Sequence, residues 1–71
     1  MEDYQYRVLI EKNDLDVKCR ALRYFIGSAP YLALGEAEQA LLQAQLSVMC
    51  NYSAILGERI KGFDVQPLLG Q

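Results

Sequence analysis

Two arginines near the end of the first long helical pattern are the residues best suited to chemistry in this chain. Arg20 and Arg23 lie three positions apart, with Tyr24 adjacent and Lys18 close by. Arginine can bind phosphate through two parallel hydrogen bonds, and a tyrosine ring offers a flat face for stacking. In an oligomer, these four side chains could line a pocket between subunits for an anion or a nucleotide. Their ordinary role would be solvation of the helix and pairing with nearby carboxylates.

The two cysteines, Cys19 and Cys50, could suggest a disulfide, but the expected register of the chain argues against one. In a helical hairpin that turns between residues 27 and 35, Cys19 would lie level with about residue 43, or ~10 Å from Cys50 along the axis. A disulfide needs Cα atoms within about 7 Å of each other. We therefore expect both thiols to be reduced.

No group of residues suggests catalysis. The chain has no histidine, so the commonest general base is missing. Two cysteines without histidine also argue against zinc, and Asp14 and Asp16 lie about 200° apart on a helix, too far to share a metal. The segment from Gly27 to Pro30 lacks the further glycines and the lysine of a phosphate-binding loop. We predict no catalytic residues, no metal, no cofactor and no enzymatic activity.

The first helix is expected over about residues 4–26. Val8, Leu15 and Leu22 recur every seven residues and would form its inward face. Gly27 should end the helix, because glycine readily adopts the positive φ of a helix cap. Ser28 and Pro30 are then expected to keep the connector free of helix.

The second helix is expected over about residues 36–62. Glu36 and Glu38 would lie in its first turn, where negative charge complements the helix dipole. Two helices joined by a short connector favour an antiparallel hairpin, so the fold class is all-α. The hairpin would occupy residues 1–63, and residues 64–71 would form a C-terminal tail.

The second helix carries more apolar surface than the first can cover. Its apolar residues spread over roughly 180°, whereas one packing partner needs a stripe only a little over 100° wide. We therefore expect a helical-bundle homo-oligomer; the alternative is a monomer whose connector and tail fold over the surplus. Gln45 lies within the apolar sector and could fix the subunit register or simply lie at its rim. The candidate interface residues are Leu42, Gln45, Leu46, Met49, Leu56, Ile60 and Phe63.

Composition narrows the set of partners. A net charge of −2 argues against general nucleic-acid binding, which needs an excess of basic residues. No apolar run is long enough to cross a membrane, and Glu2 and Asp3 do not suit a signal peptide, so we expect a soluble cytoplasmic protein. The connector is unusually apolar, and its residues Tyr31, Leu32 and Leu34 could meet a partner.

The second helix also carries a pattern similar to a known group of proteins. The residues of this pattern are Leu41, Leu42, Gln45, Leu46, Met49, Tyr52, Ile55, Leu56, Arg59 and Ile60. Together with Tyr6-Arg7-Val8-x-x-Glu11 and Leu22-x-x-Phe25-Ile26, this spacing resembles short accessory proteins of tailed phages, the crAss-phage-related small proteins, over about residues 4–63. A looser architectural likeness links the chain to the helical-hairpin sponges with which phages sequester cyclic-nucleotide immune signals.

The resemblance implies three hypotheses of function. In the first, a phage or prophage accessory protein binds a host protein stoichiometrically, in counter-defence or host takeover. In the second, an oligomeric sponge sequesters a cyclic-nucleotide signal through Lys18, Arg20, Arg23 and Tyr24. In the third, a structural or regulatory oligomer binds another phage protein. None of the three involves an enzyme.

Overall fold

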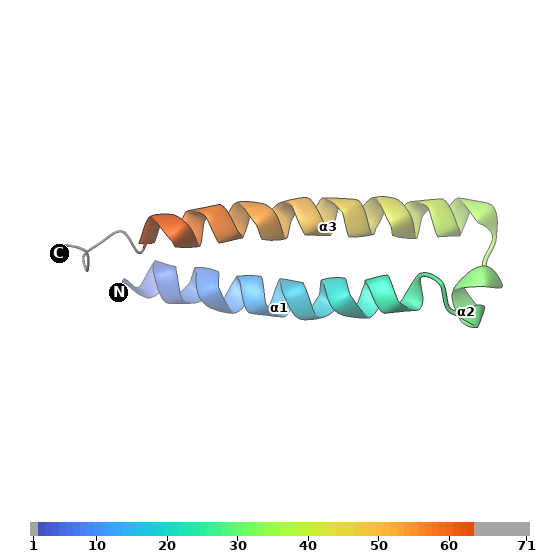
Figure 1. Cartoon of the computed structure of the whole chain (residues 1–71), viewed down its shortest axis with the longest axis horizontal. Coiled ribbons are helices and arrows are strands. Elements are labelled where there is room, and N and C mark those ends of the chain that lie inside the picture. Colours follow the sequence, from blue (N-terminus) through green and yellow to red (C-terminus); the bar gives the residue numbers. More distant parts are fainter. Residues whose placement is uncertain (1, 64–71) are drawn as a thin grey trace.

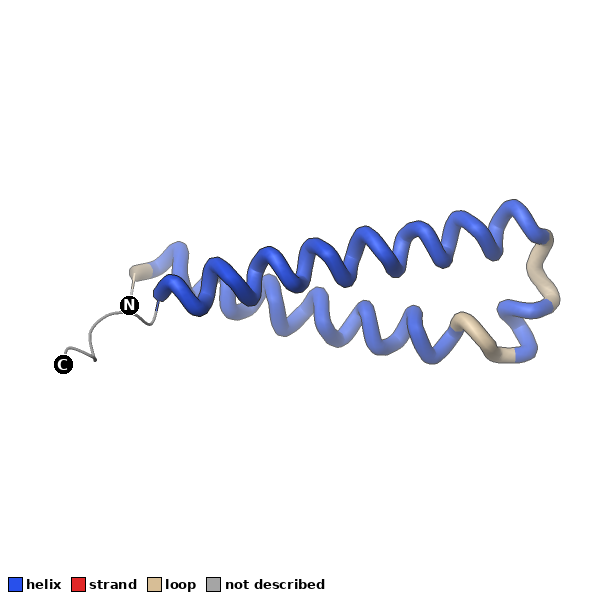
Figure 2. Tube along the Cα trace, turned by 45° about the horizontal axis from the view of Figure 1, so that its top comes forward, coloured by secondary structure: helices blue, strands red, loops and turns tan. Residues whose placement is uncertain are grey.

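The computed structural model describes residues 2–63, which form a slender helical hairpin. It consists of α1 (Asp3–Phe25), the short α2 (Ala29–Leu32) and α3 (Glu36–Phe63). The two long helices lie antiparallel along most of their length, and α2 forms the turn at one end (Figures 1 and 2). The predicted all-α hairpin is therefore confirmed. The predicted tail, residues 64–71, lies outside the described residues.

Local signals at the ends of α1 explain its bounds. Glu2 and Gln5 form a capping box, in which the Glu2 backbone N–H donates to Gln5 Oε1 at 2.8 Å. This exchange satisfies backbone groups that the first turn leaves unpaired. At the other end, Gly27 adopts a φ of +115°, a conformation that side chains with a Cβ disfavour. The predicted helix stop at Gly27 is confirmed.

The connector contains a helical turn, so the prediction of a connector without helix was wrong. Ser28 precedes α2 and its Oγ accepts a hydrogen bond from the Tyr31 N–H at 3.3 Å. Pro30 lies in the first turn of α2, where the missing proline N–H would have no partner within the helix. Tyr31 is buried, with only 4% of its surface exposed, and its ring packs edge-on against Phe25.

Two glutamines of α3 hold α2 in place. The Gln39 Nε2 donates to the carbonyl oxygens of Tyr31 and Leu34 at 3.1 and 3.0 Å. The Gln43 Nε2 donates to the Tyr31 hydroxyl at 2.7 Å. Because α2 packs against the first turns of α3, those turns extend beyond the end of α1 (Figure 1).

This extension shifts the register of the hairpin from the predicted one. The rings of Tyr4 and Phe63 pack edge-on at 5.8 Å, and Cys19 lies beside Cys50. The numbers of two residues that face each other across the helix pair therefore sum to about 67–69. The predicted register, in which Cys19 lies level with residue 43, corresponds to a sum of 62. The predicted separation of Cys19 from Cys50 was wrong, because it treated the connector as a simple loop.

The core is a narrow seam between α1 and α3. Its buried residues are Val8, Leu15, Cys19 and Leu56. Leu46, Met49, Ile60 and Phe63 pack against this seam and are partly buried. Leu56 is only 1% exposed, so its assignment to a subunit interface was wrong: α1 already covers it. The other candidate interface residues keep some exposed surface, and their role between subunits stays a prediction.

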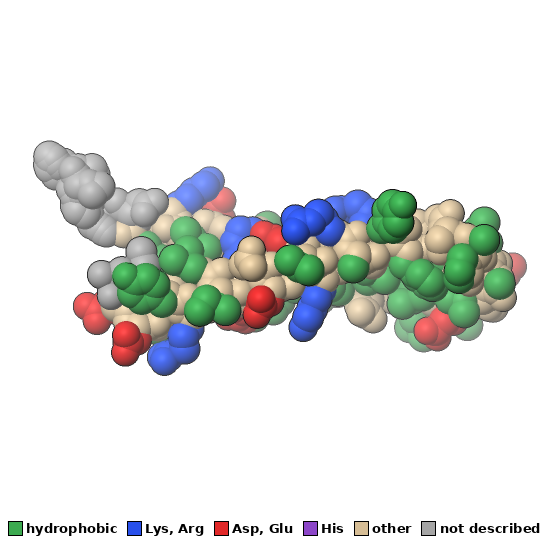
Figure 3. Space-filling view, turned by 90° about the horizontal axis from the view of Figure 1, so that it is seen from below, with side chains coloured by type: hydrophobic (Ala, Val, Ile, Leu, Met, Phe, Trp, Pro, Cys, Tyr) green, Lys and Arg blue, Asp and Glu red, His purple; other side chains and the backbone are tan. Residues whose placement is uncertain are grey.

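Each long helix leaves a row of apolar side chains exposed outside this seam. We call Leu41, Val48, Tyr52 and Ile55 the α3 stripe, and Tyr6, Ile10, Val17 and Tyr24 the α1 stripe. At 100° per residue, the α3 stripe lies about 110° from the core-facing side of its helix, and the α1 stripe lies on the back of α1. Hydrophobic side chains are visible between charged ones on the face in Figure 3. No helix among residues 2–63 combines the length and hydropathy needed to span a bilayer.

Candidate functional site

The structure separates the four residues that the sequence grouped as an anion site. Lys18 lies in a groove on one side of α1, together with Tyr52 of α3. Arg20 and Arg23 line a groove on the opposite side, with Cys50 and Ser53 of α3. Tyr24 lies at the back of α1 beside Arg20 and Arg23. The predicted set therefore forms two places where an anion could bind, and Lys18 does not share a groove with the arginines.

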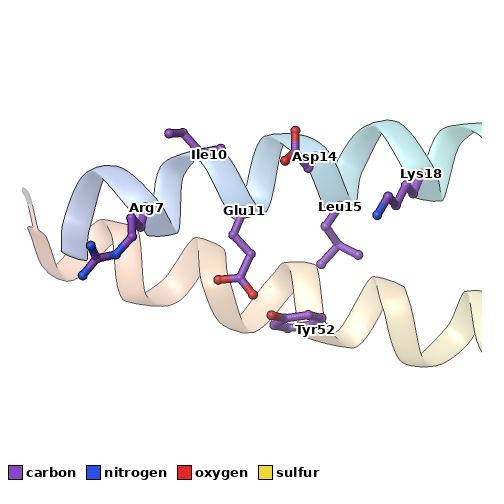
Figure 4. Close-up of a pocket in the computed structure, with 7 residues that line it drawn as sticks. All are labelled: Arg7, Ile10, Glu11, Asp14, Leu15, Lys18 and Tyr52. Carbon is purple, nitrogen blue, oxygen red and sulfur yellow. The ribbon is translucent and has the colours of Figure 1, made fainter. Parts of the chain in front are cut away.

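The first groove runs between α1 and α3 and has a volume of about 490 Å³. The Leu15 side chain points toward α3 at the bottom of this groove, and the Tyr52 ring lies along α3 beside it (Figure 4). Arg7 and Lys18 supply positive charge, and neither forms an ion pair within the described part of the chain. Glu11 and Asp14 also line the groove, so along its α1 wall two negative groups lie between the two positive ones.

The second groove is smaller, about 210 Å³, and more polar. Arg23 Nη2 donates a hydrogen bond to Cys50 Sγ at 3.1 Å, which draws this guanidinium toward α3. Arg20 has no ion-pair partner among residues 2–63. Beside Arg20, the Tyr24 ring is 88% exposed and open to a ligand. An arginine and an exposed aromatic ring on one helix face could contact a phosphate and a base.

A polar network closes the second groove on its inner side. Lys12 Nζ donates to Asp16 Oδ2 at 3.1 Å and to Ser53 Oγ at 2.8 Å. The Ser53 hydroxyl donates in turn to Asp16 Oδ1. The hydrogen bonds from Ser53 and then from Lys12 lower the pKa of Asp16 below its ordinary value. The three side chains tie α1 to α3 at one register, and they satisfy polar groups that would otherwise be costly near the core.

The two thiols are neighbours at the floor of this groove. Both cysteines are free, and the Cys19 and Cys50 side chains lie close to each other where both line the groove. Burial and then the neighbouring Cys50 raise the pKa of Cys19. Cys19 is therefore a weak nucleophile in the thiol form at neutral pH.

The connector offers less surface to a partner than its sequence suggested. Tyr31 is buried inside the chain, so its assignment to partner binding was wrong. Leu32 is 66% exposed, and Leu34 is half-buried. Leu32 is thus the connector residue most available to a partner.

Sequence reasoning missed Arg7 and Tyr52 as wall residues of one groove, and Lys12 and Ser53 as a network. A signal for the network was present. Lys12 lies between Val8 and Leu15 on the inward face of α1, where a polar side chain needs a partner. For Tyr52, no signal in the sequence separates a groove residue from a core residue. Within residues 2–63, no cluster of three or more histidine, cysteine or acidic side chains is placed to hold a metal ion.

Comparison with known proteins gives two matches over most of the chain. Residues 2–62 match the family described as Sequestin. A protein of Enterobacteria phage T4, described as an uncharacterized 7.5 kDa protein in the denB-rIIB intergenic region, is 40% identical over 60 residues. That alignment covers 84% of this chain and 94% of the T4 protein. No solved structure matches the chain. The predicted likeness to short phage proteins is confirmed at the level of this relative.

Proposed function

The chain belongs to the Sequestin family, and from this we propose that it acts by sequestration. It binds a host-made target stoichiometrically and withdraws it from use without chemical turnover. The phage T4 relative supports a phage or prophage origin. For a protein of that origin, withdrawal of a host-made target would serve counter-defence. The family description supports binding rather than catalysis.

The target that the geometry supports best is a nucleotide-sized anion with a flat ring system. The observation that carries this choice is the pairing of free cations with exposed tyrosine rings. Lys18 lies with Tyr52 in the first groove, and Arg20 lies with Tyr24 at the back of α1. Phosphate binds to such cations, and a base stacks on such rings. A cyclic nucleotide carries both groups, so the sponge hypothesis becomes the preferred one.

A host protein is the second candidate target, and one feature favours it. Leu32 is 66% exposed at the tip of the hairpin, where an apolar side chain could seat in a pocket of a partner. Interfaces between proteins ordinarily bury about 800 Å² on each side. A partner would therefore have to extend from Leu32 along the helices.

Calorimetric titration of the full chain tests the nucleotide target. The panel consists of cyclic dinucleotides, cyclic trinucleotides and their linear hydrolysis products. We expect heat with at least one cyclic compound and weaker binding at higher salt, because charge pairing is screened. Lys18→Ala and Arg20→Ala, measured separately, tell which groove binds, with at least a tenfold loss for the groove that does. Lys61→Ala is the control, because Lys61 is paired with Glu58 away from both grooves.

Absence of heat with every compound would remove the nucleotide target. Capture of partners from host lysate, with wild type and a Leu32→Asp variant side by side, then tests the protein target. A partner that binds the wild type and not the variant would support it.

A further inference from the structure

The middle of α3 is unusual for a helix that only one other helix covers. Residues 39–57 contain no lysine, arginine, aspartate or glutamate, which is about five helical turns without a charge. A helix exposed on one side normally carries charged residues there. One flank of α3, about 110° from the side that faces α1, instead presents the α3 stripe, whose four residues are 42–66% exposed.

The spacing within the α3 stripe is that of a helix-packing seam. Leu41, Val48 and Ile55 recur every seven residues, and Tyr52 follows Val48 by four. Such a repeat keeps one line of side chains facing a partner helix. The α1 stripe also contains a seven-residue repeat, but Asn13 and Arg20 lie along it. The α3 stripe is therefore the better candidate for a dry interface.

We propose that the α3 stripe packs against the same stripe of a second copy of this chain, with the two α3 helices antiparallel. The charges at the two ends of α3 favour this partner and this direction. Glu36 and Glu38 lie in the first turn, whereas Arg59 near the end has no ion-pair partner among the described residues. Antiparallel packing brings the acidic start of each helix toward Arg59 of the other, and parallel packing would bring like charges together.

The arrangement is self-complementary about a two-fold axis near Val48. Leu41 of one copy then lies near Ile55 of the other, and Glu38 of one copy lies near Arg59 of the other. A two-fold interface needs the same patch on both subunits, and a stripe centred on Val48 meets this condition. Tyr52 belongs both to the stripe and to the first groove, so each copy would form part of the outer wall of its partner's groove.

Solution mass, measured by light scattering on the full chain without ligand, is the first test. We expect a dimer or an even multiple of the 8.0 kDa chain. Val48→Glu should weaken association at least a hundredfold, because it places two carboxylates close together near the axis. Ser47→Glu adds the same charge one position away on an exposed side of α3, and it should leave the mass unchanged. A monomeric wild type, or equal masses for the wild type and Val48→Glu, would overturn the proposal.

Cross-linking tests the direction of packing even if Val48→Glu fails to fold. In a chain with Cys19→Ala and Cys50→Ser, one preparation carries Leu41→Cys and another carries Ile55→Cys. After mixing and oxidation, the antiparallel arrangement predicts disulfides mainly between the two different chains. Disulfides mainly between identical chains would overturn it. Both measurements omit nucleotide, so their failure would leave the sequestration proposal to its own titration.

Discussion

Single residues decide how α1 and α3 fit together. Lys12, Asp16 and Ser53 form a network across the helix pair, and its members lie at positions where apolar side chains would otherwise continue the seam. A polar group at such a position specifies one alignment, because any shift leaves it without a partner. The network therefore selects the observed register over neighbouring ones.

The pKa of Asp16 makes this network sensitive to acid. Ser53 and then Lys12 hold that pKa below its ordinary 3.8, so the carboxylate stabilises the fold at every pH above that value. This contribution is lost as the pH falls through the lowered folded-state pKa. We predict that Asp16→Asn melts below the wild type at pH 7 and that the difference vanishes in strong acid. Thermal unfolding followed by circular dichroism measures both. Asp14→Asn, a carboxylate outside the network, should match the wild type throughout.

The thiol pair gives a second prediction at this scale. Diamide oxidises two neighbouring thiols to a disulfide and is itself reduced to the hydrazine. Because Cys19 and Cys50 are in contact, we predict a disulfide within one chain that joins α1 to α3 and raises the melting temperature. Mass spectrometry should show the loss of two hydrogen atoms, and Cys50→Ser should prevent it. Products that link two chains would contradict the observed register.

At the scale of elements, the sequence predicted the two long helices to within one residue and the stop at Gly27. These features follow from local periodicity and from backbone preferences that act over a few residues. The register depended on the connector, where Ser28 and Pro30 build a helical turn although each is also common in loops. Ser28 and Pro30 are compatible with either a helical turn or a loop. The helical turn is held by hydrogen bonds from Gln39 and Gln43 of α3, and no rule that acts over a few residues connects these glutamines to α2.

The candidate site was predicted less completely than the fold. Lys18, Arg20, Arg23 and Tyr24 do line surface grooves, but on different sides of α1. Neighbours in sequence point in different directions from a helix, at about 100° per residue. Which of these side chains share a groove depends on where α3 lies beside α1. The position of α3 can be predicted only when the register of the two helices is known.

Gly57 is a weak point within α3 that can be strengthened. A Cβ at this position would meet Lys12 Cε at 3.6 Å, which is an ordinary van der Waals contact. Alanine favours a helix over glycine by about 0.5–1 kcal/mol. We predict that Gly57→Ala raises the free energy of unfolding by about this amount, measured by urea denaturation. Destabilisation would instead mean that the new methyl group displaces Lys12 from its network.

At the scale of the whole molecule, the hairpin buries very little. Five hydrophobic residues are buried among those the structure describes, and four of them form the seam. Chains of this size rarely reach useful stability from so small a core unless something else supports them. The two exposed stripes are the surfaces from which such support would come.

If copies of the chain supply that support, stability must depend on concentration. Folding coupled to dimer formation gains about 1.4 kcal/mol of apparent stability for each tenfold rise in concentration. We predict that the midpoint of urea unfolding rises steadily across a hundredfold range of protein concentration. A midpoint that stays constant would indicate a hairpin that is stable alone.

The edge-on packing of Tyr4 against Phe63 has a practical consequence for engineering the protein. It brings the beginning of α1 and the end of α3 to the same extremity of the rod, while the turn with α2 lies at the opposite extremity (Figure 1). A circular permutant that links these neighbouring helix ends and opens the chain between α1 and α2 would keep the long helices whole. A fluorescent protein joined directly before α1 or directly after α3 would start from that shared extremity and leave the far tip unobstructed.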